Sequence, residues 1–87
     1  MLIKDRVAVI TGIGPGMGRE IALAFAQNGA RLAIGARNIG YVQQVAQECV
    51  ASGAEVVALR TDLADRASCE AIVKAAIERF GGVDILV

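Results

Sequence analysis

The sequence contains no histidine, and its two cysteines, Cys49 and Cys69, form no CxxC pair. Zinc sites are built mainly from histidine and cysteine, and a histidine-based catalytic triad needs an imidazole base. Both kinds of site are therefore excluded from this stretch, and we expect no metal site in it. Cysteines without disulfide or metal spacing favour a reduced, cytoplasmic location, with both thiols as small apolar fillers on helix faces.

An excess of charge of one sign and a long apolar run are also missing. Nine Lys and Arg residues balance nine Asp and Glu residues, so the formal net charge is zero. A neutral chain has no bulk attraction for nucleic acid or for an anionic membrane, and we expect neither as a partner. No run approaches the roughly 20 apolar residues that cross a bilayer. The N-terminus, with Asp5 among its early charges, is unlike a signal peptide.

Apolar residues are abundant: they make up 55% of the 87 residues. Four short, nearly continuous apolar runs alternate with three longer segments of helical spacing. Such short runs are typical of strands that are covered on both faces, as in a parallel sheet. The expected strands are Val7–Ile10, Leu32–Ile34 with Ala36, Val56–Leu59 and Val83–Val87.

Each of the three segments between these strands has an apolar face of helical period. The expected faces are Ile21, Phe25 and Asn28 with Ala22 and Ala24 alongside; Val42, Val45, Ala46 and Cys49; and Val73, Ala76, Ile77 and Phe80. Asp65 is placed to cap the start of the third helix. Gly29, Gly53 and Gly81 follow the last turns, where glycine commonly ends a helix.

The resulting order β-α-β-α-β-α-β, with short connections and right-handed crossovers, predicts an α/β fold of the Rossmann type. We expect a doubly wound parallel sheet with strand order 3-2-1-4. This order leaves Val83–Val87 at an edge, although the run is apolar except for Asp84 and edge strands are usually short, charged or covered. We therefore expect residues 1–87 to be the first part of a larger single domain, or the ordered part of a longer chain.

The stretch TGIGPGMG, residues 11–18, puts four glycines directly after the first strand. In an open α/β sheet, ligands bind beyond the carboxyl ends of the strands, where the strand order reverses. Glycines let the backbone turn there and let a phosphate approach the free N–H groups of the following helix. The loop is therefore expected to bind a pyrophosphate. Met17 breaks the spacing GxGxxG, and no Gly-Lys pair completes GxxxxGK[ST]. The spacing that fits is T-G-x-x-x-G-x-G, with Thr11, Gly12, Gly16 and Gly18.

With this glycine pattern the sequence resembles the short-chain dehydrogenase/reductase family, and the resemblance runs along the whole chain. The further landmarks are Asn28-Gly29-Ala30 before the second strand, Asp62-Leu63 after the third, and Asp84 to Val87 as the fourth. The resemblance implies an oxidoreductase that transfers hydride between NADP(H) or NAD(H) and a small-molecule carbonyl or alcohol. It also implies a homodimer or homotetramer in the full-length form. A non-catalytic relative that holds or senses a dinucleotide is the alternative.

The resemblance also implies which residues bind the cofactor. These are Gly12, Gly16, Met17, Gly18, Arg37, Asn38, Asp62 and Leu63. Ala36 stands where an NAD-selecting aspartate would be and Arg37 follows it, which favours NADP(H), with Arg37 on the 2′-phosphate and Asn38 as a helper. An Arg37 that is merely solvated is the other reading, and Pro15 stands where many NADP-preferring members have a second basic residue.

Asp62 is expected on the adenine amino group with the Leu63 backbone alongside. The alternative is that Asp62 caps the following helix. Met17 matches a position whose backbone faces the phosphates.

The catalytic part of the family pattern is absent from residues 1–87. Family chemistry uses a tyrosine as acid and base, a lysine four residues later and a serine. The single tyrosine, Tyr41, has Val45 at the lysine position, so no catalytic residue is assigned. The family's N-N-A-G segment would begin just after Val87. We therefore expect residues 1–87 to be the N-terminal dinucleotide-binding part of a Rossmann-fold domain.

Overall fold

The computed structural model describes residues 3–13 and 16–87. It contains seven elements in alternating order: β1 (Val7–Ile10), α1 (Met17–Gln27), β2 (Arg31–Ala36), α2 (Ile39–Ala51), β3 (Val56–Arg60), α3 (Arg66–Phe80) and β4 (Ile85–Leu86). All strand pairs are parallel, and the sheet has the order β3-β2-β1-β4. The predicted doubly wound α/β fold and its strand order are confirmed.

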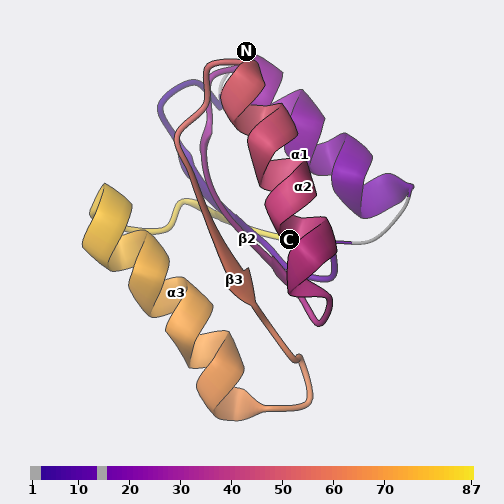
Figure 1. The fold of residues 1–87 in the computed structure, drawn as a ribbon. Helices are drawn as coiled ribbons and strands as arrows, with labels where there is room; N and C mark the ends of the chain where they lie inside the picture. Colours follow the sequence, from indigo (N-terminus) through magenta and orange to yellow (C-terminus); the bar gives the residue numbers. More distant parts are fainter. Residues whose placement is uncertain (1–2, 14–15) are drawn as a thin grey trace.

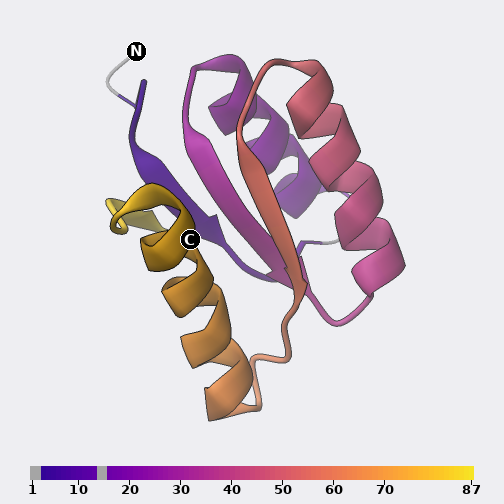
Figure 2. The same ribbon diagram turned by 60° about the vertical axis from the view of Figure 1, so that its left-hand side comes forward.

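The helices cover both faces of the sheet. Figures 1 and 2 show α1 and α2 together on one face and α3 alone on the other. All four residues of β1 are buried, and they alternate between the two layers, as the side chains of a strand must. Ala8 and Ile10 join the cluster under α1 and α2, whereas Val7 and Val9 join the cluster under α3. The apolar run Val7–Ile10 is thus a strand buried on both faces.

The predicted helix ends are confirmed. The carboxylate of Asp65 accepts a hydrogen bond from the N–H of Ala67 at 3.0 Å, which makes Asp65 the N-cap of α3. Gly29, Gly53 and Gly81 follow the three helices with φ angles of 87°, 94° and 89°. This left-handed region is the one that favours glycine.

The predicted apolar faces of α1 and α3 are partly wrong. Ile21 and Phe25 are half-buried and pack against the core as predicted, but Ala24 is exposed and the fully buried residues of α1 are Ala22 and Ala26. Asn28 does not join that face, because its side-chain amide donates a hydrogen bond to the carbonyl of Ala24 at the end of the helix. Small residues face the sheet because they let the helix lie close to it.

In α3 the buried residues are Ile72 and Ala76, and Ile77 is 50% exposed. Apolar residues occur on both sides of this helix, so helical spacing alone fits either face. The predicted face of α2, in contrast, is confirmed, with Val42, Val45 and Cys49 fully buried.

The last strand is shorter than predicted and is tied to β1 by Asp84. Its carboxylate accepts the N–H of Val7 at 2.8 Å, and its own N–H donates to the carbonyl of Val7 at 2.8 Å. Asp84 therefore has a structural role at the start of the sheet. Among the described residues, no helix is long and apolar enough to span a membrane.

Candidate functional site

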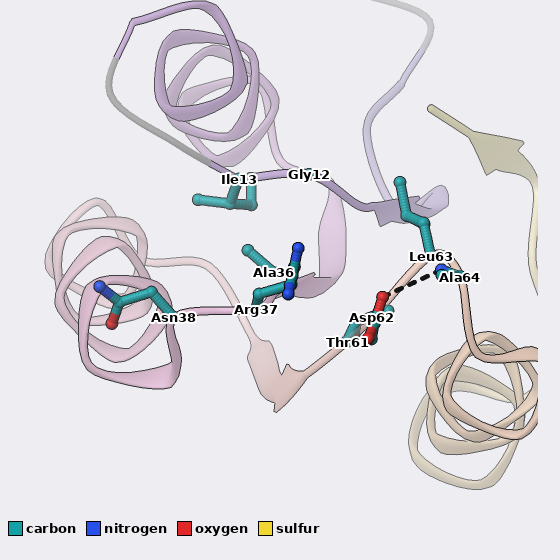
Figure 3. A pocket seen from close by; sticks show the side chains of 9 residues that line it. All are labelled: Gly12, Ile13, Ala36, Arg37, Asn38, Thr61, Asp62, Leu63 and Ala64. Atoms are coloured by element: carbon teal, nitrogen blue, oxygen red, sulfur yellow. Dashed lines mark hydrogen bonds between the residues drawn. The ribbon is translucent and has the colours of Figure 1, made fainter.

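A cavity of about 450 Å³ opens beyond the carboxyl ends of β1, β2 and β3. It lies between the segments that follow these three strands (Figure 3). The residues that line it are Gly12, Ile13, Ala36, Arg37, Asn38, Thr61, Asp62, Leu63 and Ala64. The structure thus brings Gly12, Arg37, Asn38, Asp62 and Leu63 to one cavity, whereas Gly16, Met17 and Gly18 lie beside it at the start of α1.

Two glycines of the first loop are required by backbone conformation. Gly12 has a φ of 69° and Gly16 a φ of 96°, and a Cβ added at either position would meet no atom within 4 Å. Space is therefore available at both positions, but their left-handed φ disfavours any residue with a side chain.

Gly18 is required by packing instead. A Cβ added there would lie 3.2 Å from the carbonyl oxygen of Gly12 and 3.2 Å from the Cα of Ile13. Gly18 therefore lets the first turn of α1 approach the end of β1 closely. Gly14 and Pro15, which also belong to this loop, lie outside the described residues.

The start of α1 exposes backbone donors. Gly16 is the N-cap, and no side chain of the described residues caps the helix. The first intrahelical bond runs from the N–H of Glu20 to the carbonyl of Gly16. The N–H groups of the first turn are therefore available to an anion, and the helix dipole adds roughly half a positive charge there. Met17, in this first turn, is 76% exposed.

Arg37 and Asn38 follow β2 at the mouth of the cavity. Arg37 is exposed, and the described residues provide no ion-pair partner for it. Asn38 is the N-cap of α2: its Oδ1 accepts the N–H of Tyr41 at 3.1 Å. Figure 3 shows the amide of Asn38 over the start of α2, apart from Arg37. Arg37 therefore stands as a free cation beside the positive end of α2.

Arg19, the other basic residue near the glycine loop, is committed elsewhere. Its guanidinium donates two hydrogen bonds to the carboxylate of Glu48 on α2, one of them from Nε at 3.1 Å. These hydrogen bonds, followed by Coulomb attraction, raise the pKa of Arg19, and they lower the pKa of Glu48. Arg19 therefore links α1 to α2.

Asp62 closes the turn after β3. Its Oδ1 accepts the N–H of Ala64 at 3.0 Å, drawn as a dashed line in Figure 3, and its carbonyl accepts the N–H of Asp65 at 2.9 Å. The alternative in which Asp62 caps the helix is wrong, because Asp65 holds that position. The other carboxylate oxygen of Asp62, Oδ2, has no hydrogen-bond partner among the described residues. Asp62 therefore keeps an acceptor for a ligand.

Sequence reasoning missed Thr61, which lines the cavity, and Gly35, which packs against Thr61. Thr61 is 2% exposed, and its N–H donates to the carbonyl of Ala36 at 2.8 Å. A Cβ on Gly35 would lie 2.1 Å from the Oγ1 of Thr61. A glycine inside an apolar strand run is a known sign of such a close approach and could have indicated it.

The two cysteines differ in their surroundings. Cys49 is fully buried and fits its predicted role as an apolar filler, and desolvation raises the pKa of its thiol to about 11. Cys69 is half-buried, with its Sγ 3.8 Å from the carbonyl oxygens of both Asp62 and Leu63. Within residues 3–13 and 16–87, no group of three or more His, Cys, Asp or Glu residues is arranged to hold a metal ion.

The four-stranded parallel sheet, with its cavity where the strand order reverses, defines a Rossmann-type α/β protein. The chain belongs to the short chain dehydrogenase family, whose model matches residues 6–87. It is 44% identical over 85 residues to the glycine betaine reductase ATRR of Emericella nidulans, covering 98% of this chain.

Two solved structures are also similar. The alcohol dehydrogenase of the archaeon Thermococcus sibiricus, complexed with 5-hydroxy-NADP, has a TM-score of 0.86 and 40% identity over 93% of this chain. The glucose dehydrogenase of Caenorhabditis elegans has a TM-score of 0.90 and 30% identity over 99% of it. The chain spans 7%, 35% and 38% of the lengths of these three proteins, respectively.

Proposed function

We propose that this chain forms the cofactor-binding part of an NADP(H)-dependent oxidoreductase. The reaction is hydride transfer between the nicotinamide and a carbonyl or alcohol group of a small-molecule substrate. The observation that carries the proposal is the cavity at the ends of β1, β2 and β3, with the free cation Arg37 at its mouth. Membership of the short chain dehydrogenase family supports the oxidoreductase class.

The residues at the start of α1 fit a pyrophosphate. Gly16 and Gly18 leave the first-turn N–H groups without a covering side chain, and no described side chain caps them. Backbone donors at a helix N-terminus bind phosphate oxygens without any charged side chain. In this proposal the N–H groups of Met17 and Gly18 donate to the pyrophosphate, and Gly12 lets the loop turn toward it.

The residues after β2 fit a 2′-phosphate. Ala36 places a methyl group where an aspartate would repel that phosphate, and the guanidinium of Arg37 supplies charge-assisted donors. The N-terminus of α2, which begins at Ile39, adds a favourable dipole. Because Oδ1 of Asn38 is used by the N–H of Tyr41, the helper role of Asn38 falls to its amide N–H₂ group. The similar alcohol dehydrogenase complexed with 5-hydroxy-NADP supports NADP(H) over NAD(H).

The residues after β3 fit the adenine. Asp62 keeps Oδ2 for the amino group of the base, and Leu63 follows in the wall of the cavity. When bound, the nicotinamide supplies the hydride chemistry; these residues only bind and orient the cofactor. Tyr41 does not act as the acid or base here, since it lies in the first turn of α2 and Val45, at the lysine position, is buried.

The test is a fluorescence titration of the full-length protein, in which this chain is the proposed cofactor-binding part, with NADPH and NADH, followed by NADPH oxidation with a panel of ketones and aldehydes. We expect clear preference for NADPH and turnover with at least one carbonyl. Equal affinities would contradict the choice of NADP(H), and no binding of either would contradict the function as a whole. Binding without any turnover would favour the alternative, a non-catalytic dinucleotide-binding relative.

A homo-oligomeric state and a cytoplasmic location belong to the same proposal. The oligomeric state is proposed because members of this family commonly form homo-oligomers. The location is proposed from the two free cysteines, Cys49 and Cys69. Size-exclusion chromatography with light scattering tests the first, and fractionation of cells tests the second.

A further inference from the structure

Ser68, in the first turn of α3, holds the backbone of Asp62. Its Oγ accepts the N–H of Asp62 at 2.9 Å across the loop between β3 and α3. Thr61, one residue earlier, is bonded to the sheet through the carbonyl of Ala36. Thr61 is thus hydrogen-bonded to the sheet, and the next residue, Asp62, is hydrogen-bonded to α3.

The start of α3 does not itself need the hydroxyl of Ser68. Asp65 already caps the helix by accepting the N–H of Ala67, and its own N–H is bonded to the carbonyl of Asp62. In a capping box, the residue three positions after the N-cap returns to the N-cap N–H. Here the N–H of the N-cap residue, Asp65, already donates to the carbonyl of Asp62. Ser68 instead accepts the N–H of Asp62, three residues before the N-cap. The hydroxyl of Ser68 therefore stabilises the turn at Asp62 and does not cap α3.

This turn is the part of the cavity wall that carries Asp62 and Leu63. The carboxylate of Asp62 is oriented by the N–H of Ala64 through one oxygen and keeps the other as a free acceptor among the described residues. If the N–H of Asp62 lost Ser68, a half-buried donor would be left without a partner. The turn would then reorient to find one, and the carboxylate would move with it.

We propose that Ser68 is a positioning residue that sets the preference of the site for adenine. The inference rests on the proposed function, in which Asp62 and Leu63 bind the adenine. The contacts proposed for the phosphates lie on other elements, at the start of α1 and after β2. Loss of Ser68 therefore weakens recognition of the base and spares recognition of the phosphates.

The experiment compares NADPH with the reduced form of nicotinamide hypoxanthine dinucleotide phosphate, which differs from NADPH by an oxygen in place of the adenine amino group. Dissociation constants for both are measured by fluorescence on the intact protein, and the ratio of the two constants reports base recognition. We expect Ser68→Ala to reduce the adenine preference about three- to tenfold, the loss typical of one hydrogen bond. Ser68→Thr, which keeps the acceptor oxygen, retains the preference.

Ser52→Ala is the matched control, because the Ser52 hydroxyl bonds only the carbonyl of Glu48 at the end of α2. A thermal melt of each variant reports folding. Should Ser68→Ala not fold, Ser68→Cys keeps the size and removes the good acceptor, and the same reduction is expected of it.

The outcomes separate the inference from the proposed function. A wild-type preference for adenine that survives unchanged in the folded Ser68 variant overturns the inference alone. Equal affinity of the wild type for both dinucleotides overturns the adenine role of Asp62, and the inference falls with it. A reduced ratio in Ser52→Ala as well would overturn the assignment to Ser68.

Discussion

Gly35 packs directly against Thr61 at the carboxyl ends of β2 and β3. A Cβ at residue 35 would lie 2.1 Å from the Oγ1 of Thr61 and 2.8 Å from the Cδ1 of Ile72. No real side chain tolerates such distances, so the absence of a side chain at Gly35 lets Thr61, which follows β3, and Ile72 of α3 pack directly against β2. The base of the cavity depends on this contact, because Thr61 lines it.

Gly35→Ala should therefore destabilise the fold. Overpacking a buried site forces its neighbours to shift at a cost of about 1–3 kcal/mol. Urea denaturation monitored by circular dichroism measures the change in the free energy of unfolding.

Gly40→Ala is the matched control for this substitution. Gly40 lies in α2, and its added Cβ would meet only the Oδ1 of Asn38, at an ordinary 3.4 Å. Alanine in a helix is preferred over glycine by up to about 1 kcal/mol, so this variant should be as stable as the wild type or more so. A Gly35→Ala protein of undiminished stability would contradict the close packing.

The sheet was predictable because each of its strands is a short apolar run bounded by helical spacing and glycine. Val7–Ile10 is apolar at every position because both faces of this strand are covered. A buried helix would need a longer apolar segment than these four residues. Helix faces were harder. In α3, residues 72 and 77 are both isoleucine, five positions apart. Ile72 is buried and Ile77 is exposed because of the tertiary packing, which the sequence pattern does not reveal.

The site divides in the same way. Glycines and the Asp62-Leu63 pair could be named in advance, because their spacing matches a family pattern. The contact of Gly35 with Thr61 and the hydrogen bond from the N–H of Asp62 to the Oγ of Ser68 join the loop after β3 to residues of other elements. A glycine inside an apolar run indicates a close approach at residue 35, but spacing along the chain does not identify the partner. Both partners, Thr61 and Ser68, were therefore found only in the structure.

Arg37→Asp should weaken NADPH binding far more than NADH binding. Charge-assisted hydrogen bonds contribute about 1.5–3 kcal/mol, so we expect NADPH affinity to fall at least about tenfold. NADH affinity should change little, because NADH has no 2′-phosphate. Fluorescence titration of both cofactors measures the two losses.

Lys74→Asp makes the same change of charge on α3, where Lys74 is exposed and pairs with Glu78. It controls for the general effect of charge on an anionic cofactor and should leave the ratio of the two affinities unchanged. Equal loss of NADPH and NADH binding in Arg37→Asp would rule out the 2′-phosphate contact.

Stability should fall in alkali through Cys49. Desolvation raises the pKa of its thiol from 9.0 to about 11, so the folded protein holds this proton where the unfolded chain has released it. The unfolded state then binds fewer protons, and the free energy of unfolding decreases as pH rises between those two values. Below pH 9.0 this group contributes no slope. Cys49→Ala should show a shallower decline across the same range in urea denaturation, and parallel curves for both proteins would contradict the assignment.

Gly16→Val should abolish binding of either dinucleotide. Gly16 has a φ of 96°, which a β-branched residue adopts only at a cost of about 1–3 kcal/mol. The new side chain would also stand at the donors of the first turn of α1, in the path proposed for the pyrophosphate.

Gly53→Val separates the two effects, because Gly53 has a similar φ of 94° and equally open surroundings but follows α2, remote from the cavity. We expect similar losses of stability in both variants by urea denaturation, with loss of NADPH and NADH binding only in Gly16→Val. Unchanged cofactor affinity in a folded Gly16→Val protein would mean that this loop does not hold the phosphates.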